Sequence, residues 1–516
     1  MPLLCKLSNL VIDGGIWMNT QRPEWNDANN ALVGQGLSMV TLYYLRRYIR
    51  FLQQLLAADA RAVELSVEVS QWLAETAAAL SKARPLLDAK SITDSQRYKV
   101  LEELGLAASR YRERVYAQER FSGKVTQDLA PIMSMLDNGL AAIDHSIERN
   151  KRDDGLYHAY NLLEVKQNAL AIDTLYPMLE GQVAVLSAGA VAADEAIAII
   201  EALFESDVYR PDQHSFILYP DRKLPGFLEK NQIPADKVKS IPLLGKMLAG
   251  GDERVIVRDV AGCYRFNADF TNGGELKAEL ESLSADYGDA VKTAREPLLA
   301  LYESVFHHQA FTGRSGGMFG FEGLGSIYWH MVSKLLLAVQ ENFFTALEQG
   351  CDAAVCQRLG ALYYRVREGI GFNKTPAEYG AFPTDPYSHT PKHAGAKQPG
   401  MTGQVKEEVL SRFGELGVRV DGGTVCIQPR LLRAREFVHE PRQFRFLDVD
   451  GNWQEIDVPA AGLAFTWCQV PLIYELSDEA NASLTVTWDD GAKQTYPELA
   501  LSPEMSAELF RRSGRV

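Results

Sequence analysis

The stretch RPEWNDANNALVGQGLSMVTLYYLRRYIRFL spans Arg22 to Leu52 and sets the main expectation for the fold. A Trp-Asn-Asp turn leads through Asn- and Gly-rich sequence into a segment whose apolar residues recur every three or four positions from Leu37. This spacing predicts an amphipathic helix. Asp27 either caps that helix, as Asp often does, or serves as a proton donor, because burial beside Trp25 would favour a protonated carboxyl.

Helical spacing of apolar residues continues to about Gly350, for example in Val63–Ala83 and Arg295–His308. The sequence therefore predicts a mainly α protein over most of its length. Residues 215–234 and 253–274 interrupt this pattern with Pro, Gly and short β-branched runs, which indicate long loops with a hairpin.

The pattern changes near the carboxy terminus. The segment Ile370–Thr402 is rich in Pro, Gly, Lys and His, and a loop of this length is usually functional or disordered. A helix is predicted at about Gln404–Leu416. Beyond it, Arg442–Val458 and Ala482–Tyr496 each place an Asp-Gly turn between alternating strands, which is a strong hairpin signal. Residues 417–516 are therefore predicted to form a small β-sandwich.

The amino-acid composition indicates which binding partners and which cell compartment are expected. The chain has 516 residues, with 67 acidic and 53 basic side chains and a net charge of −14. This balance disfavours nucleic acid and anionic membranes. Six scattered cysteines without a CxxC pair favour a reducing compartment. The amino terminus has no signal-peptide pattern, and apolar runs stay below about 18 residues, so we expect a cytoplasmic protein.

Four segments together carry a family resemblance. The Trp-Asn-Asp turn is followed by EGQVAVLSAG (Glu180–Gly189), FEGLGSIYWHM (Phe321–Met331) and AGAKQPGMTGQVKEEVL (Ala394–Leu410). In this order they resemble the inverting carbohydrate phosphorylases of glycoside hydrolase family 94, the cellobiose and oligoglucan phosphorylase relatives. The resemblance implies an (α/α)6-barrel with Asp27 as the general acid. It also implies substrate contacts by Trp25, Asn26, Asn30, Gln182, Glu322 and His330.

The third of the later segments resembles the family's phosphate-binding segment. The resemblance implies that Thr402 and the N–H of Gly403 bind phosphate. Lys397 and either His389 or His393 would add donors from the preceding loop, as hydroxyls and backbone nests do in other phosphate sites. As alternatives to phosphate binding, the two histidines form hydrogen bonds within the loop, and Lys397 is exposed to solvent.

Two further clusters have open interpretations. The glycine-rich run His307–Gly323 contains Arg314, whose guanidinium could hold phosphate or sugar, or the run is a flexible connection between helices. The segment Asp153–Glu164 combines aromatic, His and Asn residues that line sugar subsites or belong to a core. A metal site at His307, His308 and His330 is disfavoured, because Cys and helically paired His are missing.

The function expected from the resemblance is inverting phosphorolysis of β-linked gluco-oligosaccharides to an α-sugar 1-phosphate. One protein carboxyl suffices, because phosphate is both co-substrate and nucleophile, and no other cofactor is expected. One alternative is an inverting glycoside hydrolase on the same scaffold, with Glu322 or another carboxylate as the base. Another is a non-catalytic carbohydrate-binding fragment.

The position of Asp27 affects the expected domain plan. In the family the Trp-Asn-Asp turn lies near the middle of the barrel, whereas 26 residues precede Asp27 here. We therefore expect residues 1–416 to form a partial barrel, with a helical insertion at about 60–150, that corresponds to the carboxy-terminal half of such enzymes. Uncovered apolar helix faces would require a homo-oligomer or a complementary amino-terminal half.

Overall fold

The computed structural model describes residues 1–19, 32–57, 62–220, 226–306, 327, 329–370, 402–477 and 482–515, and at 329 and 402–405 it describes the backbone alone. Two compact units share these residues. The first consists of Met1–Val191, Ala198–Pro211 and Phe216–Tyr328, and the second consists mainly of Trp329–Val516. Among the described helices, none combines the length and the apolarity that a membrane crossing needs.

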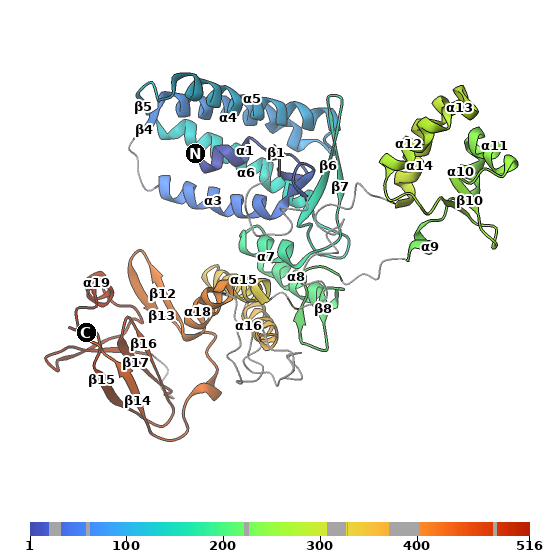
Figure 1. Cartoon of the computed structure of the whole chain (residues 1–516). Coiled ribbons are helices and arrows are strands. Elements are labelled where there is room, and N and C mark those ends of the chain that lie inside the picture. Colours follow the sequence, from blue (N-terminus) through green and yellow to red (C-terminus); the bar gives the residue numbers. More distant parts are fainter. Residues whose placement is uncertain are drawn as a thin grey trace. The chain divides into compact units, whose positions relative to one another are not determined.

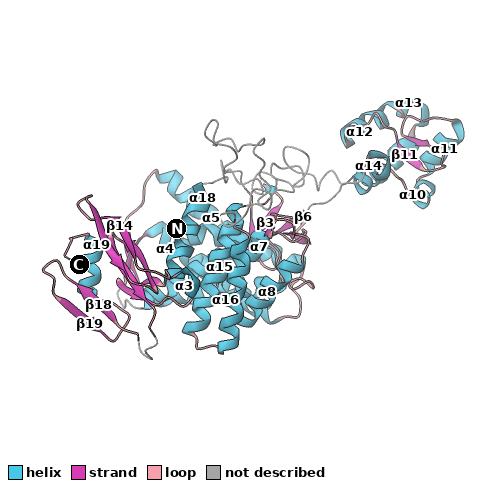
Figure 2. Cartoon of the chain, turned by 90° about the horizontal axis from the view of Figure 1, so that it is seen from below, coloured by secondary structure: helices cyan, strands magenta, loops and turns pink. Residues whose placement is uncertain are grey.

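Helices make up most of the regular structure in the described residues, which agrees with the mainly α prediction (Figure 2). In the first unit the long helices are α3 (Met39–Ala57), α4 (Val67–Ala83), α5 (Asp94–Gln118) and α6 (Leu129–Arg149). Helix α4 packs on α5 and α6, and α3 packs on α6 and on α7 (Leu179–Ser187) (Figure 1). Shorter elements beside them are α1 (Pro2–Leu7), η1 (Arg84–Asp88) and the hairpin of β4 (Val63–Ser66) with β5 (Lys124–Gln127).

An antiparallel sheet accompanies these helices, and the helical pattern did not predict it. Its strand order is β1 (Leu10–Val11), β2 (Gly15–Trp17), β3 (Gly36–Ser38), β6 (Tyr160–Lys166) and β7 (Ala169–Thr174). Val11, Leu37, Leu163 and Leu170 form its buried cluster. The stretch Asp153–Glu164, whose residues were expected either to line sugar subsites or to belong to a core, ends in the strand β6. Tyr157, Tyr160 and Asn161 are all buried.

The chain from 226 to 306 has a core of its own. Its elements are α9 (Phe227–Lys230), α10 (Ala235–Ser240), α11 (Pro242–Gly250), β10 (Ile256–Arg258), β11 (Tyr264–Phe266), α12 (Gly273–Ser282), α13 (Ser284–Tyr287) and α14 (Asp289–Phe306). Leu244, Met247, Phe266 and Leu298 belong to its core. The predicted hairpin is confirmed as β10–β11. In the two segments predicted to be loops, 215–234 and 253–274, the described residues outside this hairpin are mostly loop, apart from 215–216, α9 and the start of α12. The short helices α10 and α11 lie between the two segments.

In the second unit, the described helices that precede the strands are α15 (Trp329–Glu348), α16 (Ala353–Glu368) and α18 (Thr402–Leu416). The predicted helix at 404–416 is thus confirmed within two residues. Glu415 on α18 is 1 % exposed. It pairs with Arg367 of α16 (2.6 Å) and Arg412 (2.6 Å), and it accepts a hydrogen bond from the hydroxyl of Tyr363 (2.7 Å). This buried carboxylate fixes α16 to α18.

The remaining residues of this unit form hairpins and one helix. The strands are β12 (Val418–Asp421), β13 (Thr424–Ile427), β14 (Arg442–Leu447), β15 (Trp453–Val458), β16 (Gly462–Trp467), β17 (Val470–Glu475), β18 (Leu484–Thr487) and β19 (Lys493–Tyr496). The two hairpins predicted from Asp-Gly turns are confirmed as β14–β15 and β18–β19. Helix α19 (Pro503–Arg511) was missed, although Ser502 caps it and Pro503 starts it in the usual way.

The other described elements are α8 (Ala193–Glu205), β8 (Tyr209–Arg210) and β9 (Ser215–Phe216), and the short η5 (Ala434–Glu436) between β13 and β14. Helix α8 begins in the second unit and ends in the first by the division given above.

Candidate functional site

Most of the residues predicted for the site lie outside the described residues. This group contains Trp25, Asn26, Asp27, Asn30, Arg314, Glu322, His389, His393 and Lys397. The side chains of Gln182 and His330 are described, as are the backbones of Thr402 and Gly403 at the start of α18. The roles assigned to all of these residues stay predictions. The structure describes the framework to which several of them are attached.

The residues before and after the segment with the Trp-Asn-Asp turn belong to two paired strands, β2 and β3. Trp17 of β2 pairs with Leu37 of β3 in antiparallel register. Beyond this pair, the N–H of Met18 donates to Gly36 O (2.9 Å), and the N–H of Gly34 donates to Met18 O (2.7 Å). The indole N–H of Trp17 also donates to Gly34 O (3.0 Å). The described residues on either side of the segment 20–31, at 17–18 and 34–37, are therefore bonded to each other.

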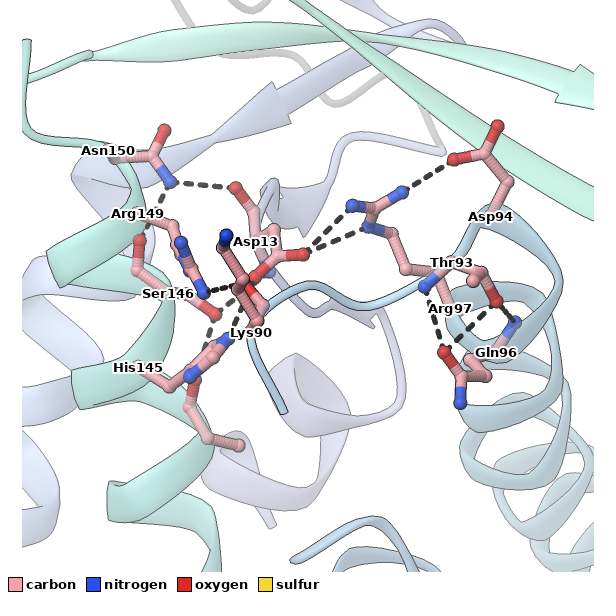
Figure 3. A network of polar contacts seen from close by, with 11 residues as sticks. Asp13, Lys90, Thr93, Asp94, Gln96, Arg97, His145, Ser146, Arg149 and Asn150 are labelled. Carbon is pink, nitrogen blue, oxygen red and sulfur yellow. Dashed lines mark hydrogen bonds and ion pairs between the residues drawn. The ribbon is translucent and has the colours of Figure 1, made fainter. Parts of the chain in front are cut away.

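A polar network fixes the turn that precedes these two strands (Figure 3). Asp13 lies between β1 and β2 and has a left-handed backbone, with φ of 69°. Its Oδ2 accepts hydrogen bonds from Nε (3.2 Å) and Nη2 (2.9 Å) of Arg97 on α5. Its Oδ1 lies 3.0 Å from Nε2 of His145 on α6. One carboxylate thus connects two long helices to the start of β2.

Amide side chains extend the network to the neighbouring strand. Asn150, next to the end of α6, donates to the carbonyl of Asp13 (2.7 Å), and the hydroxyl of Ser146 accepts the N–H of Asp13 (3.1 Å). The amide of Asn161 on β6 donates to Gly14 O (2.9 Å) and to Oδ1 of Asn150 (2.7 Å). A general acid needs a rigid support of this kind, because a small displacement weakens proton transfer.

Gln182, expected to contact substrate, is completely buried on α7. Its Oε1 accepts the N–H of Tyr157 (2.8 Å). Its Nε2 donates to Tyr157 O (2.6 Å) and to Met178 O (3.0 Å). Gly181 allows this approach, since a Cβ there would lie 3.0 Å from Ala159. In this structure the Gln182 amide holds the segment before β6 against α7.

In the second unit, α15 packs against α18. The amide of Gln340, in the middle of α15, donates to Ser411 O of α18 (2.7 Å). Ten residues earlier, His330 lies within electrostatic range of Lys406, near the start of α18. The amino-terminal ends of both helices therefore point the same way. Free N–H groups and the helix dipoles make such ends favourable for anions.

His330 is 7 % exposed in the first turn of α15. Burial, and then the ammonium groups of Lys334 and Lys406, lower the pKa of His330 to about 4. The imidazole is consequently neutral at pH 7, and the two lysines supply the local positive charge. Lys334 and Lys406 were missed, although they follow His330 and Thr402 by four residues each, which is one helical turn.

Glu407 is the other residue at this end that sequence reasoning missed. It is 5 % exposed, and Oε1 lies 3.7 Å from Nζ of Lys406. Among the described residues, no donor reaches its Oε2. The described part of the chain contains no group of three or more His, Cys, Asp or Glu side chains arranged for a metal ion.

Comparison with known proteins gives one family match. Residues 224–309 match the GH149 phosphorylase insertion domain 2. The match supports the interpretation that this chain is related to the GH149-type phosphorylases. This family is close to the family 94 phosphorylases that the sequence motifs resemble, but it is not the same family. The matched residues contain α9 to α14, which were not expected to be an insertion. No curated protein matches the chain.

Proposed function

We propose that this chain carries out inverting phosphorolysis of β-linked gluco-oligosaccharides and releases an α-sugar 1-phosphate. The observation that carries the proposal is the match of residues 224–309 to an insertion domain of a phosphorylase family. The order of the four sequence motifs supports it independently, because all four lie outside the matched residues.

The proposed chemistry needs one proton donor and one anion site. Asp27 protonates the glycosidic oxygen, and phosphate attacks the anomeric carbon from the opposite face of the sugar, which inverts its configuration. The paired strands β2 and β3 support this role, because hydrogen bonds join the described residues on either side of the segment that contains Asp27.

The phosphate is assigned to Thr402, Gly403, Lys397, His389 or His393, and Arg314. The parallel amino-terminal ends of α15 and α18 support this assignment, because Thr402 and Gly403 begin α18 and Arg314 precedes α15 in the sequence. Neutral His330 offers a hydrogen bond, and Lys334 and Lys406 offset the charge of the anion. The remaining substrate contacts are assigned to Trp25, Asn26, Asn30 and Glu322. Gln182, whose amide bonds to Tyr157 and Met178, is assigned a positioning role instead.

The proposal includes an (α/α)6-barrel of which this chain forms part, a β-sandwich at 417–516, and a cytoplasmic location. A partial barrel needs a second copy or a complementary half to cover its apolar helix faces. The exposed side chains of Tyr44, Tyr48, Phe51 and Leu55 support this, because they follow one side of α3 at helical spacing. A light-scattering mass equal to one well-folded chain would contradict the association.

The decisive experiment incubates the full chain with phosphate and β-gluco-oligosaccharides and monitors α-sugar 1-phosphate by phosphorus NMR. Asp27→Asn should lower the rate by about 10³-fold, which is the range for general acid catalysis. Asp289→Asn is the matched control, because Asp289 is almost fully exposed on α14. Reducing sugar released without phosphate would instead indicate a hydrolase. Sugar binding without turnover would indicate a non-catalytic fragment.

A further inference from the structure

One face of the β14–β15 ribbon is exposed along its whole length. The cross-strand pairs on this face are Leu447 with Trp453, Arg445 with Glu455, and Gln443 with Asp457. All six side chains are exposed. They share a face because successive side chains of a strand alternate. On the other face, Phe444, Phe446 and Ile456 are half-buried.

Trp453 is unusual on this polar face. It is 59 % exposed, whereas indole rings normally lose most of their surface on folding. The guanidinium carbon of Arg445 lies 4.3 Å from the centroid of the indole ring. A cation–π contact at this distance restrains the ring without burying it.

The turn beside Trp453 is also restrained. Oδ1 of Asp448 accepts the N–H groups of Asp450 (3.0 Å) and Asn452 (2.8 Å), and its Oδ2 accepts Nε2 of Gln454 (2.8 Å). The residues on both sides of Trp453 are therefore restrained, and Arg445 contacts the ring itself, so a ligand would have less to order on binding.

We propose that this face binds a β-linked gluco-oligosaccharide chain, at a place that contributes no residue to the proposed reaction. The choice of ligand rests on the proposed function. The C–H face of a pyranose ring stacks on the indole, and the planar groups of Gln443, Glu455 and Asp457 hydrogen-bond to its hydroxyls.

Two features of the face favour a neutral chain over other ligands. Its two carboxylates outnumber its one guanidinium, which disfavours nucleic acid and phosphorylated ligands by repulsion. The three cross-strand pairs follow one another at about 7 Å along the ribbon, so the polar groups extend beyond one sugar ring. Binding here would keep the enzyme on a long glucan between cycles, because a second attachment raises the effective concentration of chain ends.

The test measures retention of the full chain on insoluble β-glucan, in parallel with phosphorolysis of a short soluble oligosaccharide. Trp453→Ala should weaken retention about tenfold, as expected for the loss of about 1.4 kcal/mol of stacking. Arg445→Ala should weaken it less, and the rate on the short substrate should not change in either variant. Tyr116→Ala is the matched control, because Tyr116 is 74 % exposed on α5 without belonging to this face.

The outcomes separate this site from the proposed reaction. Retention that depends on Trp453 supports the site even if no phosphorolysis is found. Phosphorolysis with equal retention of the parent and Trp453→Ala overturns the site and leaves the reaction in place. A dimer that Trp453→Ala dissociates in light scattering would overturn it too, because the face would then bind a second copy of the chain. Circular dichroism of each variant verifies that it is folded.

Discussion

Arg97 on α5 donates two hydrogen bonds to a single carboxylate oxygen of Asp13, a residue with a left-handed backbone 84 positions earlier in the chain. Both side chains are largely buried, with 15 % and 12 % of their surfaces exposed. The pair joins a long helix to the hairpin that leads to the Trp-Asn-Asp segment.

Loss of this pair should loosen that hairpin. Asp13→Asn keeps the backbone conformation, which Asn tolerates, but leaves the Arg97 charge without its buried partner. We expect a destabilisation of about 2 kcal/mol, and faster hydrogen exchange at the bonded amides of Met18 and Gly34. Asp94→Asn is the control, since Asp94 pairs with the same guanidinium but is 44 % exposed. Equal effects of the two changes would contradict the assigned role of Asp13.

Glu415 should be a major determinant of stability in the second unit. Glu415→Gln removes the buried carboxylate that Arg367 and Arg412 share, although Arg412 keeps its pair with Glu436, and we expect a loss of about 3 kcal/mol in denaturant unfolding. Glu348→Gln removes the partner of Arg419 at a site where Glu348 is 56 % exposed, and it should cost less than about 1 kcal/mol. An effect of Glu415→Gln as small as that of the control would show that the pairing adds little.

His330 should make stability depend on pH. Its pKa in the folded chain is about 4, lowered from the ordinary 6.5 by burial and by Lys334 and Lys406. Between these values the unfolded chain binds the proton more readily, so stability should fall as the pH drops from 6.5 to 4 and this contribution should level off below 4. His330→Gln should have a shallower dependence over that window, measured as the unfolding midpoint. Parallel curves for the two proteins would refute the assignment.

Residues 226–306 should fold alone. Phe227, near the start, stacks on Phe306 at the end, with ring centroids 6.2 Å apart, so the two ends of the region meet. The region also has a separate core. Produced by itself, it should have helical circular dichroism and one cooperative thermal transition. Leu298→Ala should lower its stability by about 3 kcal/mol, as for other buried leucines. A gradual transition in the parent fragment would argue that it depends on the rest of the chain.

The sequence predicted the long helices and the late hairpins because their signals are local. Helix α18 has apolar residues at helical spacing, and an Asp-Gly turn marks β14–β15 within a few residues. The sheet of the first unit has no such signal, since β1 has two residues and β3 pairs with β6 at Ser38 and Tyr160. Strands this short have no readable alternation, and one partner of β3, strand β6, lies over a hundred positions away.

The sequence motifs predicted which residues belong to the candidate site, but not the hydrogen bonds that hold the surrounding structure in place. Gln182 was selected from a motif, yet its three hydrogen bonds to Tyr157 and Met178 follow from how α7 packs. The contacts of Asp13 with Arg97 and His145 likewise depend on helices far apart in the sequence. The lysines beside His330 were predictable, because they lie one helical turn from residues that the motifs had already identified.

The parallel helices α15 and α18 have a consequence for engineering. One long stretch of sequence precedes α15, which begins at Trp329, and another precedes α18, which begins at Thr402. These two helices pack against each other. A chimera that takes only one of these stretches from a relative would combine it with the other stretch of this chain, which comes from a different protein. Transplants and randomised libraries should therefore treat both stretches as one cassette, although more than seventy positions separate their ends.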